Sequence, residues 1–191
     1  MTARTGMSTV IADLRADAQA GTADFTIGST AYWSDDQLQA ILDANRTDFS
    51  HEALISEWDY SAGTIVYKRY YLPFKNVEAG TALVIEDGLG VAVGTANYTV
   101  DYNANTVTFA ADTGGSALYA TGRSYNRNRA AADVWRRKAA YYGTRPDFST
   151  DNHSVKFGAV AQMCLNMAAQ FEAQSGQTIV TAYRSDNYEG R

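Results

Sequence analysis

The sequence predicts an α+β fold, in which a helical bundle of about four helices carries a large inserted antiparallel β domain. Apolar residues recur at helical spacing before residue 50 and after residue 125, and the period changes to two between those positions. The strands are therefore grouped in one block between helices and do not alternate with them. We expect a discontinuous helical body of residues 1–49 plus 126–176, a β-rich insertion of residues 50–125 and an extended C-terminal tail of residues 177–191.

The first 49 residues contain two helical patterns. We expect the first helix over residues 9–20 and, after it, a linker that is anchored to the core by aromatic and aliphatic side chains (Phe25, Ile27, Tyr32 and Trp33). The second helix opens at Ser34-Asp-Asp-Gln37, which is a capping box. In this motif the Ser34 hydroxyl and the Gln37 amide each satisfy a free backbone amide of the other residue. The helix then continues to about Asn45.

Residues 50–125 read as antiparallel strands separated by turns. The densest run of β-branched and aromatic residues covers residues 64–72, and Ser61-Ala-Gly63 before it is a turn. Two further alternating runs, residues 98–102 and 106–109, flank Asn103-Ala-Asn105 and predict a hairpin. A last strand is expected over residues 117–125.

The chain is organised around residues 126–176, which read as two helices joined by a loop. The second helix, over residues 155–175 with Ser154 as its N-cap, is apolar almost all round. Its core stripe is Phe157, Val160, Ala161, Cys164, Met167, Ala168 and Phe171, and the opposite line holds neutral amides. Such a helix must be covered on most sides, and it is too short and too polar to span a membrane. Either its own bundle buries it, or it is shared with a neighbouring subunit.

Composition and charge restrict the functional classes. With 191 residues the chain can hold one ordinary domain or two small ones, and its net charge is −5. Residues 1–50 and 51–125 each carry a net charge of −4, and residues 126–191 carry +3. The acidic total argues against generic nucleic-acid binding. One cysteine allows no internal disulfide and the first residues lack the apolar core of a signal peptide, so we expect assembly in a reducing cytoplasm.

No catalytic, cofactor-binding or metal site is predicted, and we do not expect an enzyme. His51-Glu52 begins like a zinc-protease motif but lacks the second histidine. The run from Asp101 to Asp112 resembles a calcium loop, yet Thr106 occupies the position that requires glycine, so a hairpin turn explains it better. Cys164 lies in an apolar stripe, which favours a packing role over thiolate chemistry.

One basic cluster lies in the first helix of the 126–176 stretch, formed by Arg129, Arg136 and Arg137. Two interpretations remain open. The cluster is either a solvated helix face, or a face that touches DNA or an acidic subunit.

The order of motifs resembles one known family. An N-terminal helix is followed by Ser34-Asp-Asp-Gln-Leu38, which opens the second helix. The β block with Tyr98-Thr-Val-Asp101 and Thr106-Val-Thr-Phe109 comes next. Ala130-Ala-Ala-Asp-Val-Trp135 and Asp147-Phe-Ser-Thr-Asp-Asn-His-Ser154 introduce the last two helices. This arrangement, over most of residues 9–176, resembles the head-to-tail connector (adaptor, or head-completion) family of tailed bacteriophages.

The resemblance implies a structural subunit of the virion neck with no catalytic residues and no cofactor. Members of the family form a ring, typically of twelve copies, which docks beneath the portal protein and continues the DNA channel towards the tail. The expected partners are therefore other copies of the chain, the portal, a tail or further neck protein, and passing double-stranded DNA bound without sequence specificity. Because C-terminal segments in the family commonly reach the portal, the predicted portal-binding residues are Tyr183, Arg184, Tyr188 and Arg191.

A different class of function also fits the β-rich block. Its aromatic side chains could form a sugar-binding platform, which would make the protein a recognition module on a helical stalk. The candidate platform residues are Trp58, Tyr67, Tyr70 and Tyr71. Alternation along the strands predicts that about half of them pack into the core.

Overall fold

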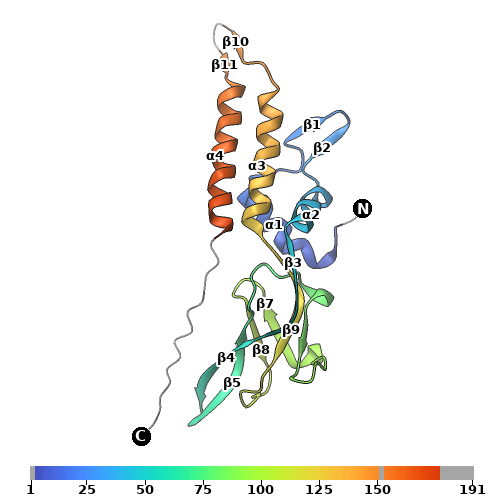
Figure 1. The fold of residues 1–191 in the computed structure, drawn as a ribbon, viewed down its shortest axis with the longest axis vertical. Coiled ribbons are helices and arrows are strands. Elements are labelled where there is room, and N and C mark those ends of the chain that lie inside the picture. The colour runs from blue at the N-terminus through green and yellow to red at the C-terminus, as the bar shows by residue number, and fades with distance from the viewer. Residues whose placement is uncertain (1–2, 151–152, 177–191) are drawn as a thin grey trace.

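A computed structural model of the chain describes residues 3–150 and 153–176. Within these residues the fold is α+β, with four α-helices and eleven strands in four antiparallel sheets. Figure 1 shows a long hairpin of α3 and α4 standing above a β-rich region, with α1 and α2 beside its base. Three 3-10 helices also occur, at Thr5–Met7, Gly80–Ala82 and Thr95–Asn97.

The expected bundle of about four helices with an inserted β domain is wrong. Helices α1 (Ser8–Asp17) and α2 (Asp35–Ala44) have ten residues each, whereas α3 (Arg127–Gly143) and α4 (Phe157–Ser175) have 17 and 19. At about 1.5 Å per residue, the first two helices reach only part of the way along the other two. They pack beside the first half of α3, so the α3–α4 hairpin projects beyond them.

The local signals of α2 are confirmed. The Ser34 hydroxyl accepts a hydrogen bond from the Gln37 backbone amide, and the Gln37 side chain accepts one from the Ser34 amide at 2.9 Å. Helix α1 ends at Asp17, earlier than predicted, because Gln19 adopts a positive φ of 48°. The two helices and the start of α3 enclose one hydrophobic core, formed by Met7, Val10, Ile11, Leu14, Trp33, Leu38, Ile41, Leu42, Tyr125, Ala130, Ala131 and Val134.

The segment between α1 and α2, expected to be a linker, forms a two-stranded ribbon. Strand β1 (Phe25–Ile27) pairs with β2 (Thr30–Tyr32), and Gly28 between them takes a φ of +61° that a tight turn favours. Phe25 is buried and stacks on Tyr141 of α3 at 4.1 Å. Ile27 is not an anchor, because 52 % of it is exposed.

The β-rich region consists of two sheets that enclose a second core. A three-stranded sheet has the order β3-β9-β6, and a four-stranded sheet has the order β4-β5-β8-β7. The predicted hairpin is confirmed as β7 and β8, since Asp101 accepts hydrogen bonds from two turn amides. The strands are β3 (Arg46–Ala53), β4 (Ile55–Ser61), β5 (Thr64–Tyr71), β6 (Val84–Glu86), β7 (Tyr98–Asp101), β8 (Thr106–Phe109) and β9 (Tyr119–Tyr125). The core residues are Phe49, Leu54, Tyr70, Leu72, Val77, Leu83, Ile85, Val107, Phe109, Leu118 and Ala120.

Two paired strands join the β-rich region to the helices. Strand β3 starts directly after α2, strand β9 ends directly before α3, and Arg46 pairs with Tyr125 at this junction. Strand β3 therefore crosses residue 50, where the predicted insertion begins. The partition into residues 1–49 with 126–176, 50–125 and 177–191 stays a prediction, and residues 177–191 lie outside the described part of the chain.

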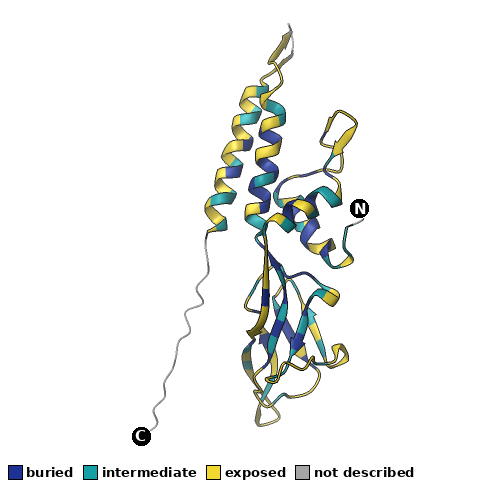
Figure 2. Cartoon of the chain, turned by 45° about the vertical axis from the view of Figure 1, so that its right-hand side comes forward, coloured by how far each residue is buried: buried dark blue, intermediate teal, exposed yellow. Residues whose placement is uncertain are grey.

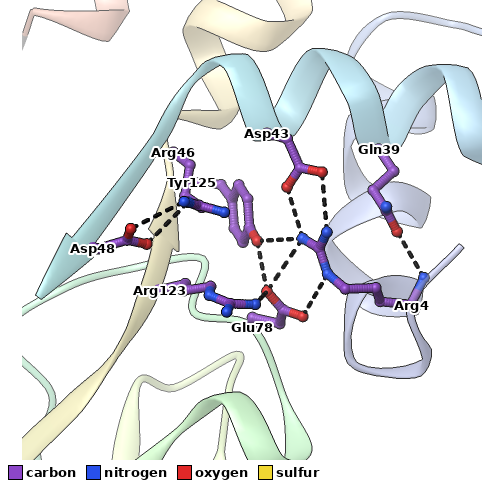
Figure 3. A network of polar contacts seen from close by, with 8 residues as sticks. All are labelled: Arg4, Gln39, Asp43, Arg46, Asp48, Glu78, Arg123 and Tyr125. Carbon is purple, nitrogen blue, oxygen red and sulfur yellow. Dashed lines mark hydrogen bonds and ion pairs between the residues drawn. The ribbon is translucent and has the colours of Figure 1, made fainter.

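A polar network centred on the buried Glu78 spans this junction (Figure 3). Glu78, which is only 3 % exposed, binds the Arg4 guanidinium at 2.9 Å and accepts a hydrogen bond from the Tyr125 hydroxyl at 2.6 Å. Arg4 also binds Asp43 of α2 at 2.6 Å, and Arg123 of β9 approaches Glu78 at 3.5 Å. The network thus links the N-terminal segment, α2 and the β-rich region.

The tip of the helical hairpin is a ribbon, where a loop was expected. Strand β10 (Phe148–Thr150) pairs with β11 (His153–Val155). Helix α4 therefore begins at Phe157, two residues later than predicted, and Ser154 is not its N-cap because it belongs to β11.

Candidate assembly surfaces

Helix α3 presents different faces to different neighbours. Successive residues of an α-helix are separated by about 100°, so Ala132, Trp135 and Ala139 lie on one side. That side packs against Cys164 and Ala168 of α4. Other α3 residues, Ala130, Ala131 and Val134, belong to the core with α1 and α2. Helix α3 is therefore the element on which both the N-terminal helices and α4 depend.

The part of the chain that the structure describes covers helix α4 along one side only. Its predicted core stripe is confirmed, because Cys164 and Ala168 are buried and Val160, Met167 and Phe171 are partly buried against them. The interpretation of α4 as a helix that its own bundle buries is wrong. Met163 is 52 % exposed and Leu165 is 47 % exposed. Figure 2 shows exposed residues along the whole length of α4.

We call the uncovered side the outer face of α4, and it bears no charge. It consists of Ala159, Gln162, Met163, Leu165, Asn166, Ala169, Gln170 and Ala173, all of them exposed. Glu172 is the one charged residue of the helix, and Arg136 binds it at 2.6 Å. Solvated helix faces usually carry charged residues, whereas the centres of protein interfaces are depleted of them and enriched in methionine. The outer face of α4 therefore has the composition of an interface.

A second uncovered surface lies between α3 and the β1–β2 ribbon. Here a hollow of about 590 Å³, which we call the α3 groove, is lined by residues of both elements. Its walls are aromatic, since Phe25 stacks on Tyr32 at 5.0 Å and on Tyr141 at 4.1 Å. The lining residues are Phe25, Thr26, Ile27, Gly28, Tyr32, Arg137, Ala140, Tyr141 and Thr144.

The predicted basic cluster is not one patch. Arg136 is neutralised by Asp133 at 3.0 Å and by Glu172 at 2.6 Å. Arg137 points about 100° away from Arg136 around the helix and lines the α3 groove. Arg129 is exposed two turns earlier, on the side of Arg136. The structure therefore assigns a separate environment to each of the three arginines.

Sequence reasoning missed a buried lysine. Lys138 of α3 is buried, and its ammonium group has polar partners. It donates a hydrogen bond to the Gln19 carbonyl at 2.8 Å, binds Asp24 at 2.7 Å and lies 4.9 Å from the Trp135 ring. The signal in the sequence was a lysine at an apolar position, but its partners lie more than 100 residues away.

The aromatic residues of the β4–β5 ribbon divide between surface and core. Trp58 is 64 % exposed and Tyr60 is 66 % exposed, and they pair across the strands with Tyr67 and Ile65. Tyr70 is buried, and its hydroxyl bonds to Thr113 and Ser116, so it cannot belong to a sugar platform. Trp58 and Tyr60 remain as an exposed aromatic strip on the ribbon.

Two observations on the described residues bear on catalysis. His51 lies 3.1 Å from Glu86, but the Thr121 hydroxyl donates to the same carboxylate and not to the imidazole. This arrangement does not activate a nucleophile, which requires the hydroxyl to contact the base. In residues 3–150 and 153–176, no three histidine, cysteine, aspartate or glutamate residues are grouped so that they could hold a metal ion.

Cys164 is buried, and burial raises the pKa of its thiol. A thiol in such surroundings stays protonated and unreactive at neutral pH, which agrees with the predicted packing role.

Two further observations concern the portal and the membrane. The predicted portal-binding residues, Tyr183, Arg184, Tyr188 and Arg191, lie outside the described residues. None of the described helices has the length and hydropathy needed to cross a membrane.

Comparisons with known proteins identified no relative. No protein-family model, no curated protein and no solved structure matches the chain.

Proposed function

We propose that the chain is a structural subunit of the neck of a tailed-bacteriophage virion. In this role it assembles into a ring, joins the portal to the tail or to a further neck protein, and lines the path of the DNA. The observation that carries the proposal is the outer face of α4, an exposed and uncharged helix side with two large apolar residues. The resemblance of the motif order to head-to-tail connectors supplies the identity of the assembly.

The physical argument concerns what would cover α4. Burying a large aliphatic side chain contributes roughly 1.5–3 kcal/mol, and part of this remains to be gained at Met163 and Leu165. The amides of Gln162, Asn166 and Gln170 can bond across an interface without the desolvation cost of charges. A contact between two different surfaces of identical subunits closes into a ring when its rotation permits. The outer face of α4 is suited to such a contact.

Electrostatics support a role in which DNA passes without being held. The chain is acidic, with a net charge of −5. Arg136 and Arg127 are engaged by neighbouring carboxylates. An excess of acidic over basic groups weakens the binding of phosphates, and weak binding is what passage through a channel requires.

Native mass spectrometry of the purified chain with a portal ring would test the proposal. We expect a complex that contains one portal ring and about twelve copies of the chain, as closed cyclic symmetry and the resemblance imply. The portal ring mixed with an unrelated acidic protein of similar mass is the control. A chain that stays monomeric and leaves the portal ring unchanged at high concentration would contradict the proposal.

A second candidate function rests on the exposed aromatic strip of the β4–β5 ribbon. Trp58 and Tyr60 lie on the same face of β4, and Trp58 and Arg69 help to line a pocket of about 300 Å³. Exposed aromatic faces beside hydrogen-bonding groups suit the recognition of a glycan. A binding module of this kind would need no ring.

Substitution of the aromatic strip separates the two candidates. If the second is correct, Trp58→Ala weakens binding on a glycan array by roughly tenfold or more, since a stacked aromatic contributes about that much. Tyr70→Phe, at a buried position, is the control that should leave binding unchanged. An array without any bound glycan for the unmodified chain would exclude this candidate.

A further inference from the structure

The two uncovered surfaces of the helical hairpin lie on opposite sides of α3. Counting about 100° per residue, the residues that face α4 centre on Trp135, and those that line the α3 groove centre about 180° away. Figure 1 shows the same arrangement, with α4 on one side of α3 and the β1–β2 ribbon on the other. One copy of the chain therefore exposes two different surfaces in opposite directions.

The two surfaces also lie at similar heights along the hairpin. A Cβ at Gly143 would lie 3.8 Å from the Ala161 Cβ, and the Tyr142 and Phe157 rings are 6.2 Å apart. Tyr141 and Thr144 of the α3 groove are therefore level with the first half of α4. That half carries Met163 and Leu165, which at about 100° per residue lie on the two opposite flanks of the outer face.

The chemistry of the two surfaces is complementary. Met163 offers a flexible thioether, which packs well against aromatic rings such as those of Tyr32 and Tyr141. Arg137 borders the groove and makes no ion pair within the described part of the chain. Its guanidinium can donate to the side-chain carbonyl oxygens on the outer face of α4, where no lysine or arginine would repel it.

From these observations we infer that the outer face of α4 in one copy docks into the α3 groove of the next copy. The occupant of the groove is a second copy of this chain, and the contact joins two different surfaces head to tail. Because a pair of copies retains one free surface of each kind, the contact can repeat, and it closes into a ring when its rotation permits. This inference rests on the proposed ring and assigns the interface that builds it.

Disulfide trapping tests the contact directly. In a Cys164→Ala background, which removes the native thiol, Met163→Cys and Thr26→Cys place one thiol on each surface. The chain with both changes should give a ladder of covalent oligomers on oxidation. The two single variants should give no ladder when oxidised separately, and only a covalent dimer when mixed. Leu89→Cys, in an exposed turn of the β-rich region, replaces Met163→Cys in the matched control and should abolish the ladder.

A charge substitution gives an independent measurement. Leu165→Asp should weaken assembly by at least a hundredfold, whereas Leu89→Asp places the same charge at another exposed leucine and should leave assembly unchanged. Circular dichroism and urea unfolding establish that both variants fold.

The outcomes separate this inference from the proposed function. If the chain forms rings on the portal but gives no ladder, and if Leu165→Asp does not weaken assembly, the ring interface lies elsewhere. That result would overturn the inference alone. If the chain gives a ladder in concentrated solution but does not bind the portal ring, the result would support the interface and overturn the neck function. The absence of both the ladder and portal binding would overturn the inference and the proposed function together.

Discussion

Replacement of Glu78 by alanine is expected to lower the free energy of unfolding at pH 7 by roughly 3 kcal/mol, since both the Arg4 guanidinium and the Tyr125 hydroxyl lose a charged acceptor. Glu78 is 3 % exposed and binds Arg4 at 2.9 Å, and the Tyr125 hydroxyl donates to it at 2.6 Å. In the variant, Arg4 keeps Asp43 as its partner, but the Tyr125 hydroxyl loses its acceptor. The N-terminal segment, α2 and the β-rich region would therefore separate more easily.

The effect of Glu78→Ala should depend on pH. Burial raises the pKa of Glu78, but hydrogen bonds from Arg4 and Tyr125 outweigh burial, and the net pKa lies below the ordinary value. A carboxylate with a lowered folded pKa stabilises the protein above the unfolded pKa, about 4.3 for glutamate, and loses this contribution as pH falls through the folded pKa. The difference between the two proteins should thus be constant near neutral pH and shrink in acid.

Urea unfolding followed by circular dichroism, from pH 7 down to pH 3, measures this difference. Glu52→Ala is the matched control, because Glu52 is an exposed glutamate in strand β3. It should change the free energy of unfolding by at most about 0.5 kcal/mol, as surface substitutions usually do. Equal losses for the two variants, or a Glu78 loss that stays the same in acid, would show that the network does not stabilise the junction as described.

The parts of the fold that the sequence predicted correctly depend on residues near one another in the chain. Ser34 and Gln37 form their capping box within one helical turn. Asp101 organises the β7–β8 turn through amides two and three residues away. The alternating runs on both sides therefore needed no distant partner in order to be identified.

The arrangement of the helices was not predictable in this way. Periodicity showed which side of α4 is apolar, but not how many elements cover it. That number depends on the length of α1 and α2, and α1 ends early where Gln19 takes a positive φ. The β1–β2 ribbon depends on the packing of Phe25 against Tyr141, which is 116 positions away. Contacts between residues so far apart in the chain leave no pattern among neighbouring residues of the sequence.

The candidate surfaces also divide into features with a local signal in the sequence and features that depend on distant contacts. The sequence identified the uncharged line of amides on α4 and offered a neighbouring subunit as one of two ways to cover the helix, which stays a prediction. It did not identify the α3 groove, because residues 25–28 were expected to be a linker. The basic cluster was named from its spacing, and Glu172, which neutralises Arg136, lies 36 positions later.

Replacement of Trp135 by alanine should release α4 from the rest of the chain. Trp135 is 3 % exposed and lies in the core that joins α3 to Cys164 and Ala168 of α4. Large-to-small changes of a buried tryptophan cost roughly 3–5 kcal/mol. Because α4 packs mainly against α3, we expect this loss to appear first as local opening of α4, before the α1–α2 core or the β-rich region unfolds.

The sole cysteine makes this opening measurable. Cys164 is buried, and burial raises the pKa of its thiol, so the native protein should react slowly with a thiol reagent such as Ellman's reagent. If labelling requires α4 to open, a loss of about 3 kcal/mol in Trp135→Ala accelerates it by roughly a hundredfold, since each 1.4 kcal/mol is a factor of ten. Trp58→Ala removes an exposed tryptophan and should leave the rate unchanged. Equal labelling rates in the two variants would mean that α4 is held by contacts other than those of Trp135, and the exposed outer face of α4 would then need a different explanation.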